Sequence, residues 1–444
     1  MLNSMFSNDR CPMCEIRELR RWKVGLLLYL SVTLVWCSNV GAKEKGPLQE
    51  HPKARPNTGD LRIERKPLRL YGSMETLIRG IRDHRALDLN SEFYHEAKPD
   101  QSYQQWQQQA RDCLRTGLHY DQGPLDLNAE VLRREETDEI IRELVTFDTA
   151  PWFRVKEYFL MPKNAQLPLP GLVVFHAWGG PMLFGKERIV NTGRDHPVLQ
   201  RHRASNYDGK YLAEELAKSG YAVITIDNYH FGERSPRGIH GIPDDLDPFT
   251  LSEAEYKDMD GKTRELLYLG MRQLNWAGTT WAGINFGDDS RCVDYLLSRP
   301  EVDPKRIGCT GLSGGGWRTD MLVALDARIK AAVSVGWMTT GDYQQIYNVE
   351  GACGTFTMLP GVWDRIDIPD LIAMSAPCAS MVVVGTRDRL FPPEAVKEAN
   401  RQIQKAYEWA GFPERFRAYN PPKVHCYDLQ IQQEATQWLD RHLK

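Results

Sequence analysis

The sequence predicts an α/β fold with a mostly parallel central sheet flanked by helices and an antiparallel hairpin at its start. Near residue 129, two strand-like runs begin, Glu139 to Phe147 and Phe153 to Met161, joined by a turn sequence at 148–151. After this hairpin, short apolar runs alternate with amphipathic segments of helical length. Buried strands that alternate with helices are typical of a parallel sheet covered on both faces.

Composition and charge are ordinary for a soluble globular protein. The 444 residues are 42% hydrophobic and 26% charged, and the formal net charge of −3 comes from mixed signs without long runs. This pattern predicts neither a nucleic-acid groove nor a membrane-binding patch. Six cysteines follow residue 42, and their irregular spacing does not indicate a disulfide pairing.

The first 42 residues have the pattern of a secretory signal peptide. A basic segment at 17–23 precedes an apolar run from Val24 to Val35, and small residues follow up to Ala42. We expect cleavage near Ala42, a secreted or periplasmic protein, and no stable membrane insertion afterwards. A retained anchor is the alternative, but the apolar run is shorter than the ~20 residues of a spanning helix.

Residues 43–128 predict a tether followed by a helical N-terminal extension. The tether, 43–67, is charged and contains several prolines. Ser73 can cap a first helix, and 103–118 has helical spacing of apolar residues. The apolar positions of the two helices are Leu77, Ile78 and Ile81, then Trp106, Ala110 and Leu114. We expect this extension to pack on the domain that carries the chemistry, residues 129–444.

The remaining elements follow in order along the chain. The expected strands are Leu172 to Phe175, Ala222 to Ile226, Ile307 to Thr310, Ala331 to Val335, Met381 to Val384 and Phe416 to Tyr419. The expected helices are Tyr211 to Lys218, one carrying Val293 and Leu296, one carrying Trp317 and Met321, Glu394 to Trp409, and one at the C terminus. Long connections at 181–206, 231–275 and 337–377 leave carboxyl ends of strands, so we expect them to form the walls and lid of a pocket.

The strongest local signal is a glycine-rich turn around Ser313. The expected strand 307–310 runs into Gly311-Leu312-Ser313-Gly314-Gly315 and directly into an amphipathic helix. Such a turn lifts a serine hydroxyl above the sheet, and it needs glycine on both sides because larger side chains would collide. The N–H groups at the start of the helix favour a developing oxyanion. We therefore expect Ser313 to be a nucleophile.

A nucleophilic serine needs a base and an acid, and the last strands are followed by both. His425 comes after the last expected strand, and Asp388 comes after the strand before it. The chain order Ser313, Asp388, His425 is one of the orders known for such triads. We expect His425 to accept the serine proton and Asp388 to hold the imidazole. Three rival acids lie in the loop before that strand: Asp364, Asp367 and Asp370.

An oxyanion needs two N–H donors. The backbone N–H of Gly314 follows from the turn itself, and Trp178, just after the strand ending at Phe175, is expected to supply the second. His176 stands at the same strand end. We expect it to brace the loop by hydrogen bonding and keep it as a candidate for the pocket.

Several segments together resemble one branch of the α/β-hydrolase superfamily, the dienelactone-hydrolase-like and acetyl xylan esterase-like proteins. The similar segments are 173–180, 227–234, 298–303, 311–316 and 385–392, within a resemblance that covers roughly 129–444. The resemblance implies an α/β-hydrolase fold and a Ser-Asp-His triad. The chain departs from the pattern twice: dienelactone hydrolases proper use cysteine where Ser313 stands, and the usual His-Gly pair is His176-Ala177.

The expected function is that of a secreted serine hydrolase that cleaves carboxylic esters of a small acyl group, with acetyl esters of polysaccharide as one substrate. The expected partner is a small-molecule or carbohydrate ester; no nucleic acid, metal or cofactor is expected, and the oligomeric state is left open. The alternatives are a serine peptidase related to the prolyl oligopeptidase group and a catalytically silent binding protein with a hydrolase fold. The peptidase group usually brings a β-propeller, and the sequence has no repeated four-stranded blades.

Aromatic side chains near the strand ends predict a narrow pocket. The nearer ones are Trp178, Tyr229, Phe231 and Trp337. Trp276 and Trp281 lie in or beside a long connection on the same edge. A core position is the expectation for Trp281 and the alternative for Trp276, because tryptophan is usually highly buried.

Overall fold

The central sheet of this computed structural model is mixed, with nine strands in the part of the chain that the structure describes, residues 73–444 without 122 and 349–351. Their order is β1-β2-β3-β5-β4-β6-β7-β8-β9. The strands are β1 Glu130–Glu136, β2 Ile140–Ala150, β3 Phe153–Pro162, β4 Leu169–Phe175, β5 Ala222–Ile226, β6 Val302–Leu312, β7 Ile329–Val335, β8 Ala379–Val383 and β9 Phe416–Tyr419. The predicted signal peptide, 1–42, and the tether lie outside the described residues.

The pairing of the strands confirms the predicted fold class. Strands β1, β2, β3 and β5 pair antiparallel, and the pairs from β5 through β4 to β9 are all parallel. The hairpin of β2 and β3 aligns Ile141 with Met161. Sequence analysis missed β1, because this edge strand is polar and almost fully exposed and so shows no alternation of apolar residues.

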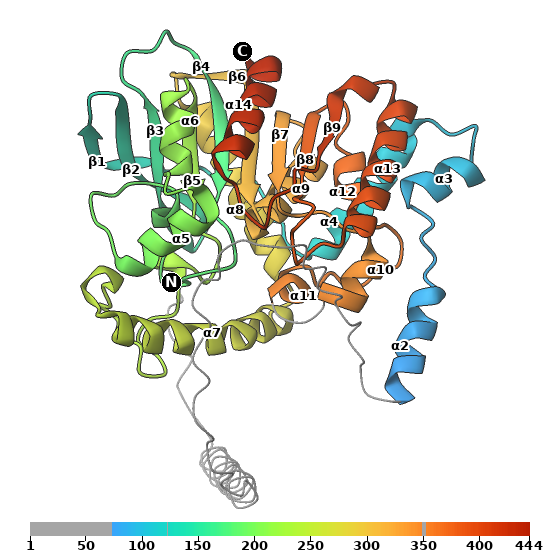
Figure 1. Cartoon of the computed structure of the whole chain (residues 1–444), viewed down its shortest axis with the longest axis horizontal. Helices are drawn as coiled ribbons and strands as arrows, with labels where there is room; N and C mark the ends of the chain where they lie inside the picture. The colour runs from blue at the N-terminus through green and yellow to red at the C-terminus, as the bar shows by residue number, and fades with distance from the viewer. Residues whose placement is uncertain (1–72, 122, 349–351) are drawn as a thin grey trace, which may run out of the picture. The chain divides into compact units, whose positions relative to one another are not determined.

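Helices cover both faces of the sheet (Figure 1). They are α2 Ser73–Asp83, α3 Ser91–Ala97, α4 Tyr103–Leu118, α5 Pro197–Tyr207, α6 Leu212–Lys218, α7 Glu253–Trp276, α8 Trp281–Ser298, α9 Gly314–Leu325, α10 Gly341–Tyr343, α11 Ala352–Phe356, α12 Asp370–Ala373, α13 Pro393–Ala410 and α14 Leu429–Leu443. Val173 and Phe175 of β4 face the core shared with α4, α8, α9 and α13, whereas Leu172 and Val174 face α6 and α14. None of the helices in the described residues is long and apolar enough for a membrane span.

The long connections contain helices that sequence analysis did not identify. The longest, α7, follows β5, and the short helices α10 and α11 follow β7. These three helices lie along one edge of the sheet (Figure 1), the edge at which parallel strands end. The helix signal of α7 is weak because only a few of its residues are buried, although Ser252 and Glu255 form a capping box at its start.

The N-terminal extension packs on this domain through α4. Trp106 is fully buried, its indole N–H donates to Leu89 O at 2.8 Å, and its ring lies 5.7 Å from that of Trp409 in α13. The predicted packing role is therefore confirmed for α4. Helix α2 differs, because its apolar side chains are exposed: Leu77, Ile78 and Ile81.

The five cysteines whose side chains the structure describes are all unpaired. They are Cys113, Cys292, Cys309, Cys378 and Cys426. Four of them are buried, so in this part of the chain they contribute to the fold as small apolar side chains.

The substitution Trp106→Ala should destabilise the whole domain. It removes a fully buried side chain and its hydrogen bond, which costs about 3–5 kcal/mol in a well-packed core. Urea unfolding followed by circular dichroism measures this loss, with Gln104→Ala on the exposed face of the same helix as the control. Equal stability of the two variants would mean that α4 is an accessory to the domain.

Candidate active site

Ser313 sits in a strained turn between β6 and α9. Its backbone has φ of 60° and ψ of −118°, in a region that residues with a side chain seldom adopt. Its N–H donates to Val335 O of β7 at 2.7 Å, which fixes the turn to the sheet. The side chain is thereby held at the carboxyl end of β6, where the sequence predicted a nucleophile.

The glycines around Ser313 are required by close backbone contacts. A Cβ atom at Gly311 would lie 2.7 Å from the carbonyl group of Gly315, and one at Gly315 would lie 2.7 Å from Phe175 O. Real Cβ atoms essentially never approach so closely. The two glycines therefore allow the strand, the turn and the helix to pack tightly enough to present Ser313.

His425 and Asp388 are joined by a hydrogen bond, between Nδ1 and Oδ2 at 2.6 Å. The Asp388 side chain is fully buried, and its other oxygen accepts the Leu390 N–H at 2.8 Å, whereas the His425 side chain is 24% exposed. The imidazole lies against Gly336, where a Cβ atom would come within 3.0 Å of its Cε1. Gly336 directly follows Val335, the residue that holds the Ser313 backbone.

The serine and the histidine are brought to the same strand end without a direct bond. No hydrogen bond between Ser313 Oγ and His425 is present in the described residues. Catalytic hydrogen bonds are often long in the absence of substrate and tighten during reaction. The geometry therefore keeps both residues as candidates.

The three rival acids are occupied elsewhere. Among the described residues, the Asp364 carboxylate accepts only from Ala86 N, at 3.4 Å, and the Asp367 carboxylate accepts from Gly341 N at 2.6 Å. Asp370 accepts from Ser91 N, at the start of α3, at 3.0 Å. These contacts favour Asp388 as the partner of His425.

The two expected oxyanion donors face one another. Gly314 is the first residue of α9, where helical N–H groups have no partner within the helix. A Cβ atom at Gly314 would lie 3.1 Å from the Trp178 backbone nitrogen, so only glycine allows this approach. The described residues include no acceptor for the Trp178 N–H, which leaves it available to a ligand.

Arg188 fixes the loop that carries Trp178. This fully buried guanidinium donates to four backbone carbonyls along the loop. The acceptors are Ala177 O at 2.6 Å, Gly179 O at 2.9 Å, Phe184 O at 2.8 Å and Pro181 O. Because one rigid group holds the loop at both sides of Trp178, the Trp178 N–H keeps its direction before substrate binds.

His176 also braces the loop that carries Trp178. It is fully buried, and burial lowers the pKa of His176 well below its ordinary value, so the ring is neutral. Its Nδ1 donates to Ala177 O at 2.8 Å, and its Nε2 accepts the Asn228 N–H at 3.0 Å. This arrangement matches the bracing role expected from the sequence.

A buried ion pair joins the loops that follow β4 and β5. Lys186 Nζ lies 2.9 Å from Asp227 Oδ2, and the Lys186 N–H donates to the other carboxylate oxygen at 2.6 Å. Burial alone would lower the pKa of Lys186, but Asp227 raises it well above the ordinary value, so the pair stays charged. The two loops are therefore tied together behind the site.

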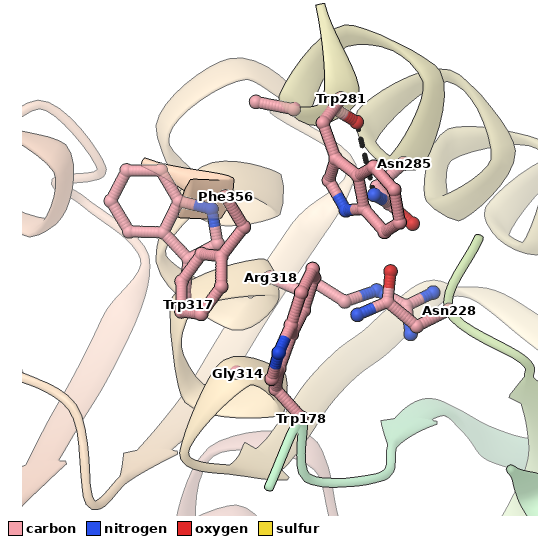
Figure 2. Close-up of a pocket in the computed structure, with 9 residues that line it drawn as sticks. Trp178, Asn228, Trp281, Asn285, Gly314, Trp317, Arg318 and Phe356 are labelled. Carbon is pink, nitrogen blue, oxygen red and sulfur yellow. Dashed lines mark hydrogen bonds between the residues drawn. The ribbon is translucent and has the colours of Figure 1, made fainter. Parts of the chain in front are cut away.

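A small pocket opens beside Gly314, with room for about one water-sized group. Its lining residues are Trp178, Asn228, Trp281, Ala282, Asn285, Gly314, Trp317, Arg318 and Phe356 (Figure 2). Arg318 is paired with buried Asp289, at 3.0 Å from Nε, and burial raises the pKa of Asp289 to about 6 against the effect of that arginine. Aromatic rings form most of the walls.

Most of the aromatic residues predicted for the pocket lie behind its walls. His176, Tyr229, Phe231 and Trp337 are not among the lining residues. The Phe231 ring lies 5.2 Å from that of Trp178, the Trp337 ring 5.4 Å from that of Trp317, and the Tyr229 ring 4.9 Å from that of Trp281. They support the lining residues instead, because their side chains point into the core between the sheet and the helices.

The two further tryptophans, Trp276 and Trp281, lie in different environments. Trp276 is 93% exposed, so the core position considered for it is wrong. Trp281 is buried as expected, but its indole also lines the pocket. Of the lining residues that sequence analysis missed, Asn228 had a usable signal, since it lies two residues after the end of β5 at the carboxyl edge.

The described residues contain no group of three or more histidine, cysteine, aspartate or glutamate side chains arranged to hold a metal ion.

Comparison with known proteins identifies the family. The sequence profile of the Abhydrolase family matches residues 62–442. YtaP of Bacillus subtilis, proposed to be a hydrolase, is 26% identical over 319 residues, which are 71% of this chain and 93% of YtaP. A Bacteroides fragilis structure, proposed to be an acetyl xylan esterase, has a TM-score of 0.55 at 16% identity and covers 79% of this chain and 83% of its own. The glucuronoyl esterase of Solibacter usitatus has a TM-score of 0.50 at 16% identity, covering 74% and 91%. At these identities the structural likeness concerns the α/β-hydrolase fold.

The substitution Arg188→Met should lower kcat on p-nitrophenyl acetate by at least about tenfold while KM changes little. Loss of one oxyanion donor costs about 10²–10³ in kcat, and this variant would loosen such a donor without removing it. The matched control is Arg203→Met. Arg203 is also buried, but it pairs with Asp195 and not with the loop that carries Trp178. Equal kcat values in the two variants would reduce Arg188 to a purely structural role.

Proposed function

The chain belongs to the Abhydrolase family, and we propose that it hydrolyses carboxylic esters through an acyl-enzyme on Ser313. One observation carries the proposal: Ser313 stands in a left-handed turn at the end of β6, beside the strand end on which the Asp388–His425 pair rests. A strained serine next to an aspartate-bound histidine has few structural reasons to exist, whereas nucleophilic catalysis requires this combination.

In the proposed mechanism, Ser313 Oγ attacks the ester carbonyl carbon while His425 Nε2 accepts the serine proton. Asp388 accepts the hydrogen bond from Nδ1 and stabilises the imidazolium. The tetrahedral intermediate then collapses, and the alcohol leaves with the proton from His425. Water, activated by the same histidine, attacks the acyl-enzyme and releases the carboxylic acid and free Ser313.

The oxyanion of each intermediate would accept hydrogen bonds from the N–H groups of Gly314 and Trp178. Both groups are fixed before reaction, the first by α9 and the second by the loop bound to Arg188. Donors that need no reorganisation during the reaction provide most of the electrostatic stabilisation in such enzymes.

The substrate we propose is a polysaccharide that carries small acyl groups. The pocket beside Gly314 has room for about one water-sized group, so a long acyl chain does not fit inside it. Two structural neighbours have names that refer to carbohydrate esters. One is proposed to be an acetyl xylan esterase, and the other is named a glucuronoyl esterase. The predicted signal peptide supports export, which would bring the enzyme to such material outside the cytoplasm.

Trp276 offers a surface for the sugar chain. It is 93% exposed and stands five residues before Trp281, whose indole lines the pocket. A flat aromatic face at this position could stack on a sugar ring while the acyl group enters the pocket.

The alternatives are a serine peptidase and a hydrolase-fold protein without activity. Both alternatives would keep the Ser313 turn and the Asp388–His425 pair. Assays with a panel of substrates, and not the geometry of the site, therefore distinguish them from an esterase. Hydrolysis of peptide amides but not esters would favour the peptidase, and no turnover of either would favour the silent protein.

The substitution Ser313→Ala should abolish ester hydrolysis, and Asp388→Asn should lower kcat by about 10⁴ by analogy with other triads. Neither change should prevent folding of the domain if it acts only on the chemistry, which circular dichroism checks. Asp364→Asn is the matched control, an exposed rival acid with one weak contact. Retention of a tenth or more of the activity by Ser313→Ala would place the nucleophile elsewhere.

The substitution Trp276→Ala should lower the ratio of kcat/KM for acetylated xylan to that for p-nitrophenyl acetate by about tenfold, the equivalent of about 1.4 kcal/mol of stacking energy. The control is Trp152→Ala, which removes another exposed tryptophan, from the β2–β3 turn at the antiparallel end of the sheet. An unchanged ratio in the Trp276 variant would exclude this residue from sugar binding.

A further inference from the structure

Two buried polar atoms of the pocket lack partners. The side-chain oxygen of Asn228 and the indole nitrogen of Trp281 make no hydrogen bond in the described residues. Both residues line the pocket, and they are only 2% and 3% exposed. Buried polar groups in native proteins are nearly always paired, so an acceptor and a donor left open in one pocket indicate a bound group.

Two other polar side chains of the pocket, those of Asn285 and Arg318, are already engaged. Asn285 accepts from Tyr229 N at 3.1 Å and donates to Trp281 O at 3.0 Å. The charge of Arg318 is balanced by Asp289, and its guanidinium also donates to Ile226 O at 3.2 Å. The two fully buried unpaired atoms are therefore a neutral acceptor and a neutral donor, and the pocket offers no unbalanced charge to an ion.

A hydroxyl has the chemistry that both atoms require. A hydroxyl can donate to Asn228 and accept from Trp281, whereas a carboxylate would repel the Asn228 oxygen and a methyl group would satisfy neither. Figure 2 shows the Asn228 side-chain oxygen directed toward the side of the pocket formed by Trp281 and Asn285. The chemistry of the open pair therefore favours a hydroxyl group.

The pocket is placed to hold the acyl part of the substrate. It borders Gly314 and Trp178, whose N–H groups are the proposed oxyanion donors, so its contents lie next to the ester carbonyl. The alcohol must leave after the first step, whereas the acyl group stays bound through both steps. A pocket with room for about one water-sized group can hold a hydroxyl of the acyl part that stays bound.

We propose that this pocket selects acyl groups with a hydroxyl close to the carbonyl carbon, as in 2-hydroxyacyl esters, and that Asn228 and Trp281 bind that hydroxyl. The inference rests on the proposed ester hydrolysis and narrows its substrate class. It makes Asn228 and Trp281 specificity-determining residues, because a site built to bind a hydroxyl discriminates strongly against analogues that lack it.

The test compares ethyl lactate with ethyl isobutyrate, which differ by a methyl group in place of the hydroxyl. The ratio of their kcat/KM values is divided by the ratio of their hydroxide-catalysed rates, because the hydroxyl also changes intrinsic reactivity. We expect a normalised ratio of at least about tenfold in favour of lactate for the full-length enzyme. p-Nitrophenyl acetate serves as the reference for esterase activity.

Two variants assign the preference to the two residues. Asn228→Leu removes the acceptor at similar size, and Trp281→Phe removes the donor while keeping an aromatic wall. Each variant should bring the normalised ratio down to within about threefold of one. If one variant does not fold, the other still tests the proposal. Trp152→Ala, in the β2–β3 turn and not among the residues that line the pocket, should keep the ratio of the unmodified enzyme.

The outcomes separate this inference from the proposed function. Hydrolysis of p-nitrophenyl acetate with a normalised ratio near one in the unmodified enzyme would overturn the inference and leave the ester hydrolysis intact. A high ratio that persists in both variants would overturn the roles of Asn228 and Trp281. No hydrolysis of any of the three esters would overturn both proposals.

Discussion

The left-handed backbone at Ser313 is the constraint on which the rest of the site depends. A serine held at φ of 60° is stable only if its surroundings fix it, and here the hydrogen bond to Val335 O and the contacts at Gly311 and Gly315 do so. The same tight turn brings Gly314 against Trp178. Strain at one residue therefore sets the position of the nucleophile and of both oxyanion donors.

Neighbouring parts of the sheet complete the arrangement without contributing to the strain. Asp388 and His425 follow β8 and β9, so the parallel strand order itself brings them beside β7 and Gly336. Arg188 and the Lys186–Asp227 pair are buried far from solvent and hold the loops after β4 and β5. Buried charges are costly unless they are paired or hydrogen-bonded; Lys186 is paired with Asp227, and Arg188 donates to four backbone carbonyls, so both hold the loops in place.

Much of this arrangement could be predicted from the sequence, because it follows from local patterns. Buried strands have continuous apolar runs, and the turn at Ser313 is a glycine signature, so the buried strands in their chain order and the predicted nucleophile needed no tertiary information. The pocket did not follow in the same way. Whether an aromatic residue such as Phe231 lines a cavity or supports its wall depends on side-chain direction, and Asn228 and Trp281 meet only in the folded chain. Helix α7 was not predicted from the sequence because few of its residues are buried.

The most direct test of the account is the site of covalent attack. The full-length protein is incubated with a fluorophosphonate, which transfers its phosphonyl group to an activated serine with loss of fluoride, and its peptides are then measured by mass spectrometry. The account predicts a single adduct, on the peptide that contains Ser313, and none in the folded Ser313→Ala variant. An adduct on another residue, or no adduct on the folded protein, would contradict it.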